Sequence, residues 1–213
     1  MANRSYLCGT NTETIYPSFV EPSYDSSSQT IANDVWCVPL LWTALFRPAD
    51  IVARTFDADG EKVYVEAPLT GKKDTLVNLG QALPYFNRLF ADEGTLDEYA
   101  RFLRQAIEAA PYEFVTIEME EIAACYDDPK EFYDMFRAAL SGIGGPPAPK
   151  MKETFIQLAQ FRNLRRFPPA DLLLDPRRME AAPDDDAWNH CRVCGAGPQE
   201  SGIGRPAPWE PSA

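Results

Sequence analysis

The chain has 213 residues, 45% of them hydrophobic and 12% aromatic, a composition typical of a folded protein rather than a disordered one. Its formal net charge of −12 disfavours binding to nucleic acids or anionic membranes and favours basic partners. No apolar run approaches the roughly 20 residues that cross a bilayer, and we expect no secretory leader, because the opening residues lack a basic stretch followed by an apolar one. Its five cysteines lack paired spacing, so we expect a cytoplasmic protein with reduced thiols.

Prolines and charges are distributed unevenly along the chain and indicate a boundary near residue 143. Eleven of the 19 prolines follow that residue. Residues 1–149 carry a net charge of −12, residues 150–179 carry +4 and residues 180–213 carry −4. We therefore expect a globular domain over 1–143, a Gly/Pro linker over 144–150, a basic amphipathic arm over 151–179 and an acidic Pro-rich tail over 180–213.

The first part of the chain predicts a strand, a loop and a short helix. Residues 3–8 are typical of a strand, and residues 9–34 are rich in turn formers and predict a long surface loop. Three aromatic residues of this loop, Tyr16, Phe19 and Tyr24, need shelter from water. Asn33 or Asp34 is expected to cap a helix over residues 39–46.

The middle of the chain predicts a hairpin followed by a long helix. Residues 51–56 and 62–67 read as strands around a tight turn at 57–60. Apolar residues then recur at spacings of three and four over 74–90, which predicts an amphipathic helix. Pro84 lies inside it and predicts a kink or a division into two helices.

The remaining pattern adds helices around one more strand. Thr95 and Glu98 fit a capping box at the start of a helix that ends near residue 110. Residues 112–118 alternate as a strand does, and residues 119–126 and 129–140 are typical of helices. Because strands and helices do not alternate regularly, we expect an α+β fold with a small, mostly antiparallel sheet packed against several helices.

A short motif near the end of the chain holds its only histidine. His190, Cys191 and Cys194 supply three of the four ligands that a structural zinc ion needs. We therefore expect no cofactor and an exposed thiol pair in a tail, with zinc binding by these three residues as the alternative.

Acidic residues gather after the last predicted strand. We find no sequence motif of nucleophilic or nucleotide-dependent catalysis and expect no catalytic residue and no enzymatic activity. Glu118, Glu120, Glu121, Asp127 and Asp128 are instead expected to form a docking patch for a basic protein, with Tyr16, Phe19 and Tyr24 as aromatic anchors.

Residues 151–167 combine apolar and basic side chains. This pattern fits either an amphipathic helix on an anionic surface or a segment that packs on the acidic body of its own chain, and we favour the second interpretation.

The opening residues Met1–Leu7, reading MANRSYL, and the acidic step at residues 117–122 resemble a group of uncharacterised bacterial α+β proteins. The size and charge of the chain are similar to those of bacterial immunity proteins, which neutralise a toxin by binding it. This resemblance implies a cytosolic immunity-like or antitoxin-like protein that covers a basic partner. A metal-dependent enzyme that uses carboxylates or His190, Cys191 and Cys194, and an assembly component that docks through its C-terminal arm, are the alternatives.

Overall fold

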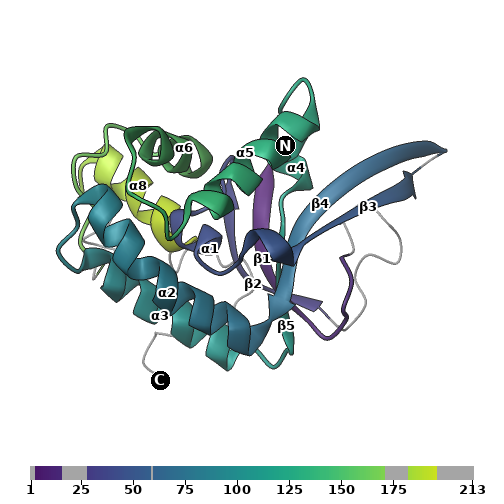
Figure 1. The fold of residues 1–213 in the computed structure, drawn as a ribbon, viewed down its shortest axis with the longest axis horizontal. Helices are drawn as coiled ribbons and strands as arrows, with labels where there is room; N and C mark the ends of the chain where they lie inside the picture. Colours follow the sequence, from purple (N-terminus) through teal and green to yellow (C-terminus); the bar gives the residue numbers. More distant parts are fainter. Residues whose placement is uncertain (1–2, 16–27, 59, 171–181, 196–213) are drawn as a thin grey trace.

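A computed structural model describes residues 3–15, 28–58, 60–170 and 182–195. It contains a five-stranded sheet in the order β2-β1-β5-β4-β3, in which every neighbouring pair runs antiparallel. Helices gather on one side of this sheet (Figure 1). The predicted α+β fold is therefore confirmed. Within the described stretches, no helix is both long enough and apolar enough to cross a membrane.

The centre of the sheet is formed by β1 (Arg4–Thr10) and β5 (Phe114–Glu118). Leu7 lies opposite Ile117 in this pair, and both side chains are fully buried. Because side chains alternate along a strand, Tyr6 and Cys8 of β1 share the other face with Thr116 and Glu118 of β5. The apolar face belongs to the main core, and the opposite face carries polar groups.

The predicted hairpin is confirmed as β3 (Ile51–Ala58) and β4 (Glu61–Gly71). Its far end extends away from the rest of the sheet (Figure 1). Gly60 in the turn has a φ of 84°, a conformation that glycine adopts at little cost. Near its base, β4 pairs with β5 and so connects the hairpin to the central strands.

The prediction of a loop over residues 9–34 is wrong for residues 28–34, because Ser28–Val35 forms the edge strand β2. Asn33 and Asp34 lie in this strand and do not cap a helix. The short helix α1 (Leu40–Thr43) instead follows Pro39 at its N-cap. Polar residues rarely predict a strand, and here pairing with β1 decides the structure.

The two longest helices follow the hairpin. Helix α2 (Lys72–Phe90) continues through Pro84 as one helix rather than two. Helix α3 (Thr95–Ala109) does not begin with the predicted capping box, because Thr95 is already its first residue and Gly94 is the N-cap. The carboxylate of Asp92 accepts hydrogen bonds from the backbone N–H groups of Gly94 and Leu96 and replaces that box.

Two further helices follow β5, as predicted. The short α4 (Glu120–Ala123) leads to α5 (Pro129–Gly142), and Asp128 caps α5 by accepting a hydrogen bond from the Lys130 backbone at 3.0 Å. A 3-10 turn, η1 (Pro48–Asp50), precedes β3.

The basic segment after residue 149 packs on the protein's own body, which confirms the favoured interpretation. Helix α6 (Pro149–Ala159) buries Phe155, Leu158 and Ala159 in the main core. The ring centroid of Phe155 lies 4.9 Å from that of Phe86 of α2. The helix ends at Ala159, where Gln160 takes a left-handed conformation, so it does not extend to residue 167.

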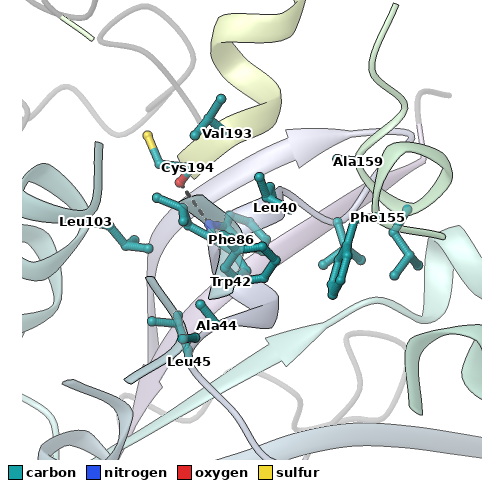
Figure 2. Close-up of a cluster of buried hydrophobic side chains, with 14 of the residues drawn as sticks. Leu40, Trp42, Ala44, Leu45, Phe86, Leu103, Phe155, Ala159, Val193 and Cys194 are labelled. Carbon is teal, nitrogen blue, oxygen red and sulfur yellow. Dashed lines mark hydrogen bonds between the residues drawn. The ribbon is translucent and has the colours of Figure 1, made fainter. Parts of the chain in front are cut away.

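The last described helix, α8 (Asp184–Cys194), also belongs to the main core. The indole Nε1 of Trp42 donates a hydrogen bond of 2.8 Å to the backbone oxygen of Cys194, and Val193 packs beside it (Figure 2). The expectation of an exposed thiol pair in a tail is therefore wrong for Cys194, which is 3% exposed. The division at residue 143 does not describe the packing, because segments on both sides of it share one core.

Replacing Gly195 with alanine is expected to destabilise the protein. Gly195 has φ 74° and ψ 138°, and a Cβ atom there would lie 2.4 Å from Cζ2 of Trp42. A strained backbone costs about 1–3 kcal/mol, and the clash adds to that cost. Gly60→Ala is the control, because Gly60 has a φ of 84° and no atom within 4 Å of such a Cβ. Urea unfolding should show a clearly larger loss for Gly195→Ala, and equal losses would contradict this account of the packing.

Candidate interaction surface

The acidic residues expected to contact a partner lie on consecutive elements at one end of the sheet. Glu118 ends β5, Glu120 and Glu121 begin α4, and Asp127 and Asp128 precede α5. Their exposure differs: Asp127 and Asp128 are exposed, Glu120 and Glu121 are half-buried, and one carboxyl oxygen of Glu118 is fully buried. They are close together in the fold but do not form one uniform charged patch.

Glu118 lies on the polar face of the sheet, directly opposite Tyr6. The neighbouring pair on this face is Cys8 and Thr116, and both are buried. Oε2 of Glu118 and Oγ1 of Thr116 are buried and have no hydrogen-bond partner in the described part of the chain. A carboxylate in such surroundings loses hydration without full compensation, so the site favours the neutral acid.

The ionisation of Glu118 follows from these surroundings. Burial, first of all, and the negative charges of Glu120 and Glu121 raise its pKa from 4.5 to about 8, against the lowering effect of a hydrogen bond with Cys8. Burial also raises the pKa of the Cys8 thiol. Glu118 is therefore mostly protonated at neutral pH, and it adds little charge to the surface.

Two of the other acids have structural contacts as well as surface charge. Oε2 of Glu121 accepts a hydrogen bond of 2.9 Å from the backbone N–H of Arg4, which ties α4 to the start of β1. Asp128 caps α5. These bonds hold the two carboxylates in fixed positions.

Residues 118–134 contain seven acidic residues and a single lysine, Lys130. We use the name acidic corner for the acids of this segment other than Glu118, whose carboxyl group is mostly neutral: Glu120, Glu121, Asp127, Asp128, Glu131 and Asp134.

An exposed tyrosine flanks the acidic corner from the hairpin. Tyr64 of β4 is 37% exposed, and its hydroxyl donates a hydrogen bond to the buried carboxylate of Glu66. Its ring lies against two residues of α5, with 6.3 Å between its centroid and that of Tyr133 and 5.8 Å between its centroid and Nζ of Lys130. Arg137 of α5 binds the same Glu66 at 2.5 Å. This network places Tyr64 beside the first turns of α5.

An exposed tryptophan flanks the acidic corner from the other side. Trp36 directly follows β2, is 47% exposed, and donates a backbone hydrogen bond of 2.8 Å to Asn3. The side chain of Asn3 lies 2.5 Å from Sγ of Cys125, which stands between α4 and α5. The backbone of Trp36 is thus bonded to the residue whose side chain contacts the segment between α4 and α5.

Sequence reasoning missed both of these aromatic residues. Trp36 follows a strand that the polar sequence of β2 did not indicate. Tyr64 stands between Val63 and Val65 in a predicted strand, and alternation would have placed it on the face opposite to these two valines. The predicted anchors Tyr16, Phe19 and Tyr24 lie outside the described residues.

The three candidate metal ligands all lie on α8. No group of three His, Cys, Asp or Glu side chains in the described stretches is arranged to hold a metal ion. His190 is fully buried, and its ring centroid lies 5.6 Å from that of Tyr99. Neither ring nitrogen has a hydrogen-bond partner among the residues that the structure describes, and burial lowers the pKa of His190 to about 4. This histidine is a neutral core residue, and Cys194 beside it is a buried thiol.

Comparison with protein-family models, curated proteins and solved structures finds no match for this chain. The similarity to bacterial immunity proteins therefore stays a prediction.

The stability of the protein is expected to depend on pH through Glu118. Its folded pKa of about 8 lies above the ordinary value of 4.5, so the folded state keeps a proton that the unfolded state has lost. The free energy of unfolding should therefore fall as pH rises from 4.5 to 8. The largest possible loss is about 1.4 kcal/mol for each unit by which the folded pKa exceeds the unfolded one.

Glu118→Gln cannot ionise and should remove this dependence. Urea unfolding of both proteins at pH 5, 6.5 and 8.5 should show Glu118→Gln gaining stability relative to the wild type as pH rises. His190 has the opposite effect, because its lowered pKa removes stability only as pH falls from 6.5 toward 4. Both proteins contain His190, so the difference between them cancels its contribution. A difference that stays constant with pH would contradict a neutral Glu118.

Proposed function

We propose that this protein is a cytosolic bacterial binding protein of the immunity or antitoxin kind, which neutralises a basic protein partner by covering its active surface. The acidic corner meets the basic surface of the partner, and exposed aromatic side chains anchor the contact. The protein acts by binding and performs no catalysis of its own.

The observation that supports this proposal most directly is the position of Trp36 and Tyr64. The large exposed apolar side chains among the described residues are Trp36, Tyr64 and Val77. Both aromatic members of this set flank the acidic corner, while Val77 lies on α2. Tryptophan and tyrosine are enriched among the residues that carry most of the energy of protein interfaces. Their position beside a cluster of carboxylates is the arrangement expected for recognition of a basic surface.

Charge explains how such a surface would find its partner. The acidic corner concentrates six carboxylates within residues 120–134, and one of them, Asp134, pairs with Arg137 of α5. A surface of one sign attracts an oppositely charged protein and raises its association rate. The aromatic side chains then contribute to the lifetime of the complex, because they bury apolar area once water is excluded.

The alternatives have less support in the geometry. A metal-dependent enzyme needs ligands that converge, and the described residues bring no such group together. An assembly arm needs a free apolar face, but α6 buries Phe155, Leu158 and Ala159 against its own core.

Loss of Trp36 is expected to weaken partner binding. The tagged protein is used to capture proteins from its native host, the main captured partner is purified, and its dissociation constant is measured. Trp36→Ala should raise that constant at least tenfold, about 1.4 kcal/mol or more. Val77→Ala removes an equally exposed apolar side chain from α2 and should leave the constant within about twofold. Equal affinities for Trp36→Ala and the wild type would argue against the proposed anchor.

Charge reversal of the acidic corner is expected to slow association. Asp127→Lys with Glu131→Lys should lower the association rate constant at low salt by about tenfold or more, and added salt should slow the wild type in the same way. Glu98→Lys with Glu108→Lys on α3 is the matched control, since it changes the net charge equally and each pair includes one acid in the first turn of a helix. An association rate that ignores salt, or that falls equally in both double variants, would count against recognition by the acidic corner.

A further inference from the structure

Trp36 has a backbone conformation that its neighbours must enforce. Its φ of 65° lies in the left-handed region, which costs a bulky residue energy. Such a residue keeps this conformation only where surrounding contacts determine it. The indole is half-exposed, so burial of the side chain alone does not explain the conformation.

The contacts that fix the chain around Trp36 come from Arg192 of α8. Nη1 of Arg192 lies 2.5 Å from Oδ1 of Asp34 and 2.9 Å from Sγ of Cys37, and it also donates to the backbone oxygen of Val35. The residues before and after Trp36 are therefore held by one guanidinium group. The hydroxyl of Ser5 adds a hydrogen bond of 2.5 Å to the backbone oxygen of Cys37.

Arg192 is itself held in place by the docking of α8. Its guanidinium lies 4.0 Å from the ring centroid of Trp188, and Arg162 stacks on the same ring at 3.5 Å. Asn189 accepts a hydrogen bond from the backbone N–H of Arg162 and donates one to its carbonyl oxygen, both at 2.7 Å. The arginine reaches β2 only when α8 occupies this position.

We infer that α8 regulates the binding surface: its docking through Arg192 holds Trp36 in the conformation that contacts the partner, so docking of α8 and binding of the partner favour each other. This inference rests on the proposed function. Arg192 acts as a positioning residue, since it touches the chain on either side of Trp36 and needs no contact with the partner. By linkage, a partner that binds the ordered Trp36 surface also stabilises the docked α8.

Fluorine NMR of protein labelled with 5-fluorotryptophan tests the coupling without a partner. The chain contains four tryptophans, and Trp36→Phe identifies the resonance of Trp36. Arg192→Lys keeps a positive charge but has a shorter side chain without the planar guanidinium, so its ammonium group should not reach Asp34, Val35 and Cys37 as Nη1 of Arg192 does. It should shift or broaden the Trp36 resonance.

A second variant guards against simple unfolding. Asp34→Asn with Arg192→Met removes both charges and leaves no unpaired buried ion, so the core is expected to fold. It should also change the Trp36 resonance, and it should weaken partner binding at least fivefold. Arg101→Met, which removes an exposed arginine from α3, should change neither.

The outcomes separate this inference from the proposed function. An unchanged Trp36 resonance in both Arg192 variants would overturn the positioning role, whatever the partner does. A changed resonance with full affinity, in a protein whose binding is lost in Trp36→Ala, would overturn the coupling to binding. If Trp36→Ala binds the partner normally, the proposed binding surface is wrong, and so is the regulation of binding by α8. This holds even if the NMR result shows that Arg192 positions Trp36. A changed resonance with reduced affinity supports both.

Discussion

The ion pair of Arg192 with Asp34 is the contact on which the arrangement of the described chain depends. Both side chains are almost completely buried, and burying two charges costs several kcal/mol for each ion unless further polar groups satisfy them. Here the backbone oxygen of Val35 and the thiol of Cys37 serve as additional acceptors. The cost is offset only in one geometry, with α8 against the end of β2. That geometry also completes the core around Trp42 and fixes the chain at Trp36.

Local signals in the sequence were sufficient for elements whose structure is decided locally. The hairpin β3–β4 follows from alternation around a tight turn, and α5 follows from Asp128 and Pro129 at the start of an apolar stripe. Strand β2 could not be predicted in this way. Its polar residues favour turns. It forms a strand because it pairs with β1 and because Arg192 binds Asp34 in the interior.

The candidate surface was predictable in its charge but not in its anchors. The acids of residues 118–134 are visible in the sequence, whereas their exposure depends on which carboxylates the fold uses internally. Glu118 is buried and mostly neutral, and Glu66 is buried against Arg137 and Tyr64. The chain around Trp36 is held by contacts with Asn3 and Arg192, which are distant in sequence. Composition also predicted a boundary at residue 143. A rise in proline content carries no information about packing, and α6 and α8 dock on the same core as the elements before that residue.

The distance in sequence between Asp34 and Arg192, 158 residues, also sets the order of events when the chain is made. Contacts between distant residues form late, because the entropy of closing a long loop is lost before they stabilise anything. During synthesis, β1 and the hairpin emerge long before α8, so the core around Trp42 stays open until residue 194 has left the ribosome. A chain that stops before α8 lacks the arginine that orders Trp36, although it contains every residue of the acidic corner. The surface thus becomes complete only in molecules whose synthesis has continued past Arg192.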